Sequence, residues 1–266
     1  MRLLAGLGLA GLVLGTAGIV EPSGAVEFAP HRAVYDLTLA RSSQSSDISD
    51  VSGTMTFEWG DSCDGWTVNQ RSLMNFIYRS GEQLELGWSL VSWEAKDGLR
   101  YRFFVRKLEN GDPSGEFRGE ARLGGEGKDG AVEYRVPAQK TVKLPPGTLF
   151  PTIHTAKLLQ AASAGKRMLW ALVFDGSDED GLFGVSAVLG PKHPPAANSR
   201  WPLLAGSSWR VGLAFFAHTG QAPEPEHEQS LRLYDNGVVD DLILDYGDFR
   251  VAARLRDLQK IAPPPC

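Results

Sequence analysis

The chain has 266 residues, a formal net charge of −5 at neutral pH and a hydrophobic content of 42%. A mildly acidic chain gives no electrostatic reason to bind nucleic acid, so we expect no nucleic-acid partner. The apolar content argues against a disordered chain. The length is sufficient for one large domain or two small ones with a buried core.

The N-terminal segment, residues 1–25, has the three parts of a secretory signal peptide. Met1-Arg2 supplies one positive charge, and an apolar, glycine-rich run follows over residues 3–20. Ser23-Gly24-Ala25 places small residues at the −3 and −1 positions, so we expect cleavage after Ala25. Gly15-Thr16-Ala17 is the alternative cleavage site. The competing interpretation is a retained membrane anchor, which the glycines of the run oppose.

The two cysteines, Cys63 and Cys266, fit an exported protein. A zinc site needs more ligands at closer spacing, so this pair is a poor metal site. In an oxidising compartment a disulfide is the simplest interpretation, and two unrelated free thiols are the alternative. Cys63 lies in an expected hairpin turn at residues 61–65. Cys266 ends a tail of three prolines, so both can adjust to disulfide geometry.

Strict alternation of apolar and polar residues runs through most of the chain after residue 25. The segments 51–59, 84–90, 99–105 and 209–215 show it most clearly. Such alternation is typical of half-buried antiparallel strands, and about a dozen segments follow it. Asn236-Gly237 separates two of them and is a strong hairpin signal, because both residues tolerate positive φ. The sequence therefore predicts a mainly β protein with a large antiparallel sheet.

Arg100, Arg102 and Arg106 form a row on the polar side of one expected strand. Such a row could meet an acidic partner or lipid headgroups, but a solvated face is the default interpretation. We expect the seven tryptophans to lie mostly at inward strand positions, where core packing explains them more simply than a ligand cage.

One segment has helical periodicity instead. Ile153, Ala156 and Leu159 recur at helical spacing, Pro151 suits a first helical position and Gly165 suits a C-terminal stop. We expect one helix at about 151–163, lying on the sheet. Residues 144–150 before it form an extended crossover near the middle of the chain. We therefore expect residues 26–266 to form a single β domain. A two-lobed layout about residues 144–166 is also compatible with this crossover.

No motif predicts a catalytic residue, a cofactor-binding residue or a metal ligand. The histidines are not paired in the way that metal or catalytic motifs require: His31, His154, His193, His218 and His227. His193 and His227 fall in proline-containing loops, where we expect them to be exposed to solvent. Residues 175–181 are acidic but lack the glycine and glutamate positions of a calcium loop, so a solvated hairpin is the better interpretation. Ser163-Ala164-Gly165-Lys166 has the Ser-x-x-Lys spacing but ends a helix rather than starting one, and its partner motifs are absent.

The chain resembles the EipB cell-envelope integrity family of periplasmic proteins from Gram-negative bacteria. Five segments and the two cysteines carry the resemblance across the chain after residue 25: residues 29–35, 144–155, 174–177, 234–238 and 244–249. The resemblance implies a sheet coiled into a spiral or incomplete barrel with the helix packed against it. It also implies a Cys63–Cys266 disulfide, a periplasmic location, and no catalytic residues or cofactor.

The first hypothesis for function is a non-catalytic periplasmic protein that supports outer-membrane integrity by binding other proteins. The resemblance implies a tetratricopeptide-repeat protein among these partners. The second is a periplasmic carrier or chaperone that binds lipid or lipoprotein acyl chains in an apolar cleft of the curved sheet. The third is a hydrolase whose site has no recognised motif.

Overall fold

In the computed structural model, the described residues are 26–266 except 180, 197–198 and 219–223. The expected signal peptide and its cleavage sites lie outside the described residues. Fifteen strands form one sheet in the order β8-β7-β6-β5-β4-β3-β2-β1-β15-β14-β13-β12-β11-β10-β9. The strands are β1 (His31–Ser42), β2 (Ile48–Asp61), β3 (Gly65–Tyr78), β4 (Gln83–Ala95), β5 (Arg100–Glu109), β6 (Asp112–Leu123), β7 (Gly130–Val136), β8 (Lys140–Leu144), β9 (Thr148–Leu149), β10 (Met168–Phe174), β11 (Leu182–His193), β12 (Ser208–Ala217), β13 (His227–Tyr234), β14 (Val239–Asp245) and β15 (Phe249–Lys260).

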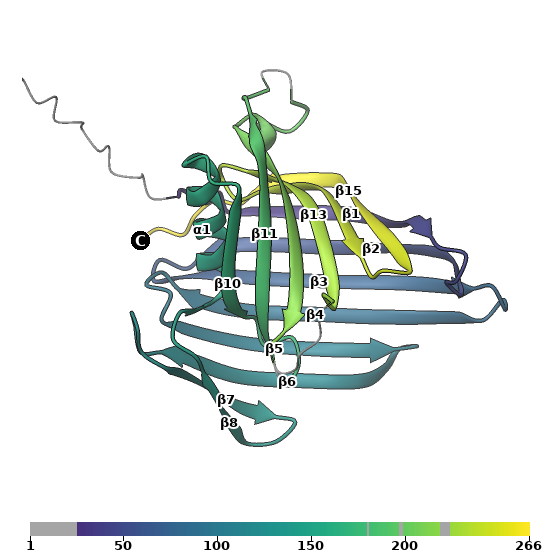
Figure 1. The fold of residues 1–266 in the computed structure, drawn as a ribbon, viewed down its shortest axis with the longest axis horizontal. Helices are drawn as coiled ribbons and strands as arrows, with labels where there is room; N and C mark the ends of the chain where they lie inside the picture. Colours follow the sequence, from purple (N-terminus) through teal and green to yellow (C-terminus); the bar gives the residue numbers. More distant parts are fainter. Residues whose placement is uncertain (1–25, 180, 197–198, 219–223) are drawn as a thin grey trace, which may run out of the picture.

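The sheet coils on itself without closing. Strands β1 to β6 run across the molecule in Figure 1, and β10, β11 and β13 run nearly at right angles to them. The two free edges are β8 and β9, which follow one another in the chain but do not pair. A short turn joins them, in which the Thr148 hydroxyl donates to the Pro145 carbonyl at 2.8 Å. The predicted mainly β fold, an incomplete barrel with one helix, is confirmed.

Neighbouring strands in this sheet are also neighbours in the chain, with one exception. Strand β1 pairs with β15, so that His31 lies opposite Lys260 and Leu37 opposite Ala253. The first and last strands therefore lie side by side in the middle of the sheet. Both partners of β1 are antiparallel, and shifts of register interrupt the β1–β15 pairing at two places. Such bulges increase the local twist and help an open sheet to coil.

The alternation of residue types gives each strand an inward and an outward face. On β2, Val51, Met55 and Trp59 are buried as predicted. The inward side chains form two clusters. The larger one contains α1 and the inward residues of β1, β2 and β10 to β15. The smaller one is built around five rings under β5 and β7: Tyr101, Phe103, Tyr134, Phe150 and Phe174.

The helix α1 (Pro151–Ser163) has the predicted bounds. It connects β9 to the parallel strand β10 and packs on the inner side of β10 and β11 through Leu158 and Leu159. Proline at its first position cannot donate a hydrogen bond, which costs nothing there because the first helical N–H groups lack intrahelical partners. Within the described part of the chain, no helix is long and apolar enough to cross a membrane.

Candidate functional surfaces

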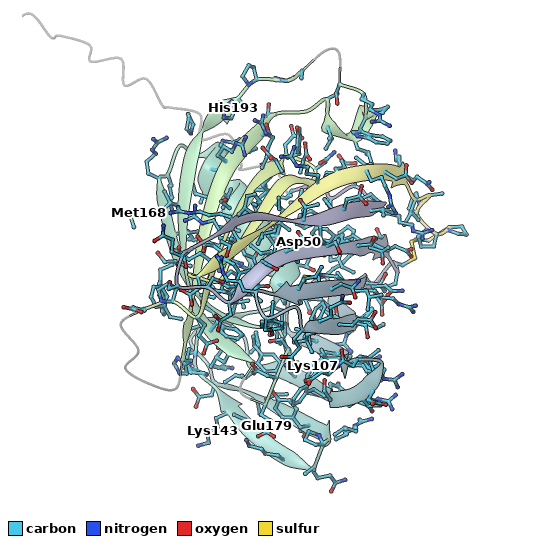
Figure 2. All side chains as sticks on the ribbon, turned by 90° about the vertical axis from the view of Figure 1, so that its right-hand side faces the viewer. Asp50, Lys107, Lys143, Met168, Glu179 and His193 are labelled. Carbon is cyan, nitrogen blue, oxygen red and sulfur yellow. A yellow bond between two sulfur atoms is a disulfide. The ribbon has the colours of Figure 1, made fainter. Side chains whose placement is uncertain are left out.

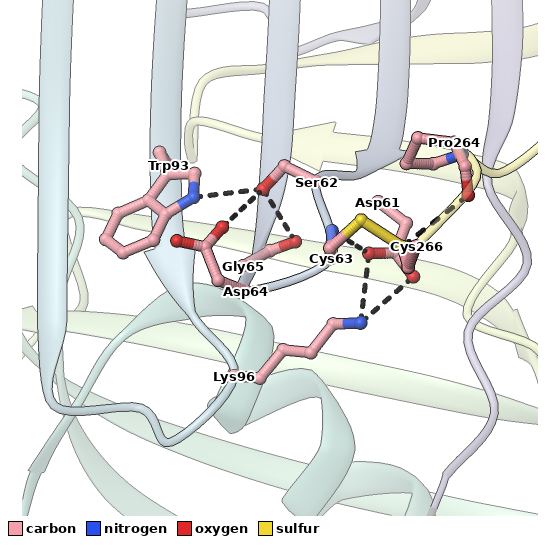
Figure 3. The surroundings of a disulfide bond; sticks show 9 residues. All are labelled: Asp61, Ser62, Cys63, Asp64, Gly65, Trp93, Lys96, Pro264 and Cys266. Carbon is pink, nitrogen blue, oxygen red and sulfur yellow. Dashed lines mark hydrogen bonds and ion pairs between the residues drawn. A yellow bond between two sulfur atoms is a disulfide. The ribbon is translucent and has the colours of Figure 1, made fainter.

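The disulfide joins the turn between β2 and β3 to the last residue of the chain. Cys63 and Cys266 are bonded, with their Cα atoms 5.8 Å apart. Figure 3 shows the turn around Cys63: its backbone N–H donates to Asp61 at 2.8 Å, and the Lys96 ammonium lies 2.9 Å from the same carboxylate. The Ser62 hydroxyl accepts from the Trp93 indole at 3.0 Å. Side chains from β2 and β4 therefore fix the conformation of this turn independently of the disulfide.

The histidines lie in separate surroundings, and two of the five are buried. His31 is 1% exposed and its Nδ1 lies 2.7 Å from the Ala29 carbonyl oxygen. His154 is buried on α1, and desolvation, assisted by Lys157, lowers its pKa to about 4. His227 was expected in an exposed loop, but it opens β13 and stacks on Phe215 at 4.4 Å. Among the described residues, no cluster of His, Cys, Asp and Glu could hold a metal ion.

Glu94 is a buried carboxylate that the sequence analysis missed. It is 2% exposed at the inward end of β4, where its two oxygens accept the backbone N–H groups of Thr152 at 2.7 Å and Ile153 at 2.9 Å. Burial raises its pKa to about 7, against the opposing effect of these hydrogen bonds. Glu94 therefore caps α1 from a strand of the other half of the sheet.

The acidic hairpin at residues 175–181 is not solvated as expected. Asp175 accepts the Ser177 N–H at 2.9 Å, and burial raises its pKa to about 6. Tyr101 donates to the Asp175 carbonyl at 3.1 Å, and Tyr134 donates to the Asp178 carbonyl at 3.0 Å. The described part of this hairpin is thus fastened over the smaller cluster. Its residue 180 lies outside the described residues.

The most exposed large apolar side chains of the described residues gather at one edge of the sheet. Met168 and Trp170 on β10 are 66% and 64% exposed, and Val188 on β11 is 58% exposed. Met168 lies directly opposite Val188, so all three face outward together. Trp170 is therefore an exception to the expectation that tryptophans mostly lie at inward positions, as Trp59 and Trp209 do. Met168, Trp170 and Val188 are called the β10 patch below.

The backbone of β10 is also free at this edge. Leu189 donates to the Arg167 carbonyl at 2.9 Å, which makes Arg167 and Leu189 a hydrogen-bonded pair. Because these pairs alternate along an antiparallel ladder, the N–H and C=O groups of Met168 and Trp170 point away from β11. Strand β9 covers this edge only at Leu172 and Val173. Among the described residues these backbone groups have no hydrogen-bond partner, so the exposed side chains of β10 stand beside unpaired backbone groups.

Known proteins resemble this chain in both sequence and fold. The chain matches the family described as EipB-like over residues 22–262. It is 33% identical over 250 residues to the cell envelope integrity protein EipB of Brucella abortus (strain 2308), covering 91% of this chain and 87% of that protein. The crystal structure of a beta-barrel-like protein of domain of unknown function DUF1849 from Brucella abortus has 30% sequence identity and a TM-score of 0.81. That match covers 90% of this chain and 100% of the other.

Proposed function

This chain belongs to the EipB-like family, and we propose that it supports cell envelope integrity as a non-catalytic periplasmic protein that binds other proteins. The name of its 33% identical relative supports the envelope role. A disulfide between distant parts of the chain supports an oxidising compartment such as the periplasm. The β10 patch is the observation that supports protein binding.

The β10 patch combines the two requirements for adding a strand to a sheet. The unpaired groups of Met168 and Trp170 offer main-chain hydrogen bonds, and their exposed side chains offer apolar contact. A free apolar edge is a liability for a protein that never uses it, because it can pair with any other chain. Natural edges usually carry charges or are covered, and this one places a tryptophan there instead.

The free part of the edge is short, because β9 occupies the positions beside Leu172 and Val173. It therefore suits a brief extended segment of a partner. Lys166 and Arg167 precede β10 and are exposed, so a segment with an acidic residue at that end would be favoured. Figure 2 shows Met168 at the margin of the molecule, on the side away from Lys107 of β5 in that view. A partner can therefore reach the patch without displacing the rest of the sheet.

The test is complementation of a strain from which the gene is deleted, challenged with detergent. The deletion should lower survival, and the wild-type gene should restore it. Trp170→Asp should fail to restore survival while the protein accumulates normally, because a charge at the edge opposes strand pairing. Leu73→Asp is the matched control, since Leu73 is a 45% exposed apolar residue in the middle of the sheet.

Full survival of the deletion strain would count against the envelope role. Full rescue by Trp170→Asp would reject the β10 patch as the binding surface. The carrier hypothesis makes a different prediction, namely that protein purified from its host carries lipid by native mass spectrometry. The inward side chains of the described strands pack into two clusters, so strand addition at the exposed edge needs less rearrangement than loading an acyl chain between them.

A further inference from the structure

A second surface lies on the outer face of β3 to β7, far along the sheet from the β10 patch. A groove of about 500 Å³ opens there across the middle of these strands. Its apolar part is formed by Val91, Trp93 and Phe104, and Val91 is 47% exposed. Three arginines border it, namely Arg102, Arg118 and Arg135. These six residues are called the arginine groove below.

Aromatic rings hold two of these guanidinium groups in place. The Arg102 guanidinium carbon lies 4.8 Å from the Trp93 ring centre, and that of Arg118 lies 5.7 Å from the Phe104 ring centre. Arg106 also lies over Phe104, at 5.5 Å. A guanidinium that stacks on a ring uses its flat face for that contact. Its N–H groups point outward in the guanidinium plane and stay free to bind a ligand. The predicted row of arginines is therefore ordered by aromatic contacts, while the side chains of Arg102 and Arg106 stay 58% and 51% exposed, as expected for a solvated face.

The charges around the groove are only partly compensated. Glu120 is paired with Arg122 at 2.6 Å, and Arg102 lies 4.0 Å from it. Among the described residues, neither Arg118 nor Arg135 forms an ion pair with a carboxylate. Glu58 is the remaining acidic residue in the groove lining. A chain with a net charge of −5 thus concentrates unpaired arginines on one face.

We propose that the arginine groove binds the phosphate of a lipid headgroup at a membrane surface. Arginine presents paired N–H donors that match phosphate oxygens, and Val91 with the two rings offers contact for the apolar part next to the headgroup. Strands β3 to β6 are hydrogen-bonded on both sides, so a peptide has no free edge to pair with here. A phosphate needs only donors and positive charge, which the outer side chains supply.

This site is independent of protein binding at the β10 patch, because the two surfaces share no residue. It would let the protein remain at a membrane surface while the sheet edge stays available to a partner. Juxtaposed basic and aromatic side chains are typical of proteins that bind anionic membrane surfaces.

The experiment is vesicle flotation of the protein without residues 1–25. Vesicles contain either phosphatidylcholine alone or phosphatidylcholine with phosphatidylglycerol. We expect binding to the anionic vesicles, decreasing as salt rises. Replacing both Arg118 and Arg135 by Gln should weaken binding roughly thirtyfold, from the usual contribution of a basic side chain near an anionic surface. The spectra of the folded protein should not change.

The matched control is the double variant Arg32→Gln and Arg254→Gln. It removes the same two charges from exposed positions on β1 and β15. Retention of vesicle binding by this control, with its loss in the groove variant, supports the site. Equal loss in both variants would overturn it, because only net charge would then matter. Absence of binding to anionic vesicles, or its abolition by millimolar inorganic phosphate, would also overturn it, the latter by identifying free phosphate as the ligand.

Discussion

Removing the disulfide should destabilise this protein without altering its fold. The bond closes a loop that spans 203 positions. Loop-closure entropy for that length amounts to about 5 kcal/mol, and measured losses for native disulfides are typically about 2–5 kcal/mol. In the folded state, β15 is held independently through its register with β1, and Ile261 donates to the Pro30 carbonyl at 2.9 Å. The loss should therefore act mainly on the unfolded chain.

The assay is urea unfolding followed by tryptophan fluorescence, for the wild type, Cys63→Ser, Cys266→Ser and the double variant. All three variants should lose about 3–5 kcal/mol of unfolding free energy, and equally, because breaking either end opens the same loop. The dependence on urea should steepen, since an unfolded chain without the cross-link exposes more surface. Wild-type protein with a reductant should match the variants.

Two results would refute this reasoning. Additive losses in the double variant would mean that the cysteines stabilise the fold through separate contacts. Loss of the native near-ultraviolet spectrum in the absence of urea would mean that the β1–β15 pairing depends on the covalent bond. A larger loss for Cys63→Ser alone would instead locate part of the effect in the β2–β3 turn.

Two further changes test the interior. The pKa of Glu94 is about 7 in the folded protein and 4.5 ordinarily, so the folded state binds the Glu94 proton more tightly than the unfolded state does. The contribution of Glu94 to the free energy of unfolding therefore falls as pH rises from 4.5 to 7, by about 3 kcal/mol in all. Glu94→Gln should flatten that part of the stability–pH curve measured by urea unfolding, and an unchanged difference between pH 5 and pH 8 would contradict the assignment. Gly176→Ala should cost about 1–3 kcal/mol, because Gly176 has φ +70° and an added Cβ would lie 2.6 Å from Phe103. Thermal unfolding with Gly165→Ala as the comparison, where φ is +72° but no atom lies within 4 Å of the added Cβ, separates the backbone cost from the contact with Phe103.

Local pattern predicted most of the elements. Alternation identified the strands, and the proline and glycine signals around residues 151–165 gave the helix its correct bounds. The same alternation extends from Leu90 through Ser92 to Glu94 and could have shown that Glu94 points inward. We missed it because acidic residues are rarely buried without a partner, and its partners are backbone groups 58 and 59 positions away.

The remaining features depend on the order of strands in space, which residue types do not encode. Trp170 is exposed because it alternates with the inward residues Ala171 and Val173, and its place beside a free backbone edge follows from β10 lying next to the end of the sheet. His227 reads as part of a polar loop, and it is stacked on Phe215 because β12 and β13 pair at that end. The arginine row was visible in the sequence, but Trp93, the ring that contacts Arg100 and Arg102, comes from the neighbouring strand β4.

The central pairing of β1 with β15 has a consequence for how the protein is made. Synthesis delivers β1 among the first folded residues and β15 among the last, so β1 keeps an open edge until the final strand arrives. Cys266 follows β15, so Cys63 can form this disulfide only after β15 has been made. A chain that stops before β15 would keep a free thiol at Cys63 and an open edge on β1. The disulfide can therefore form only when both strand partners of β1, namely β2 and β15, are already present.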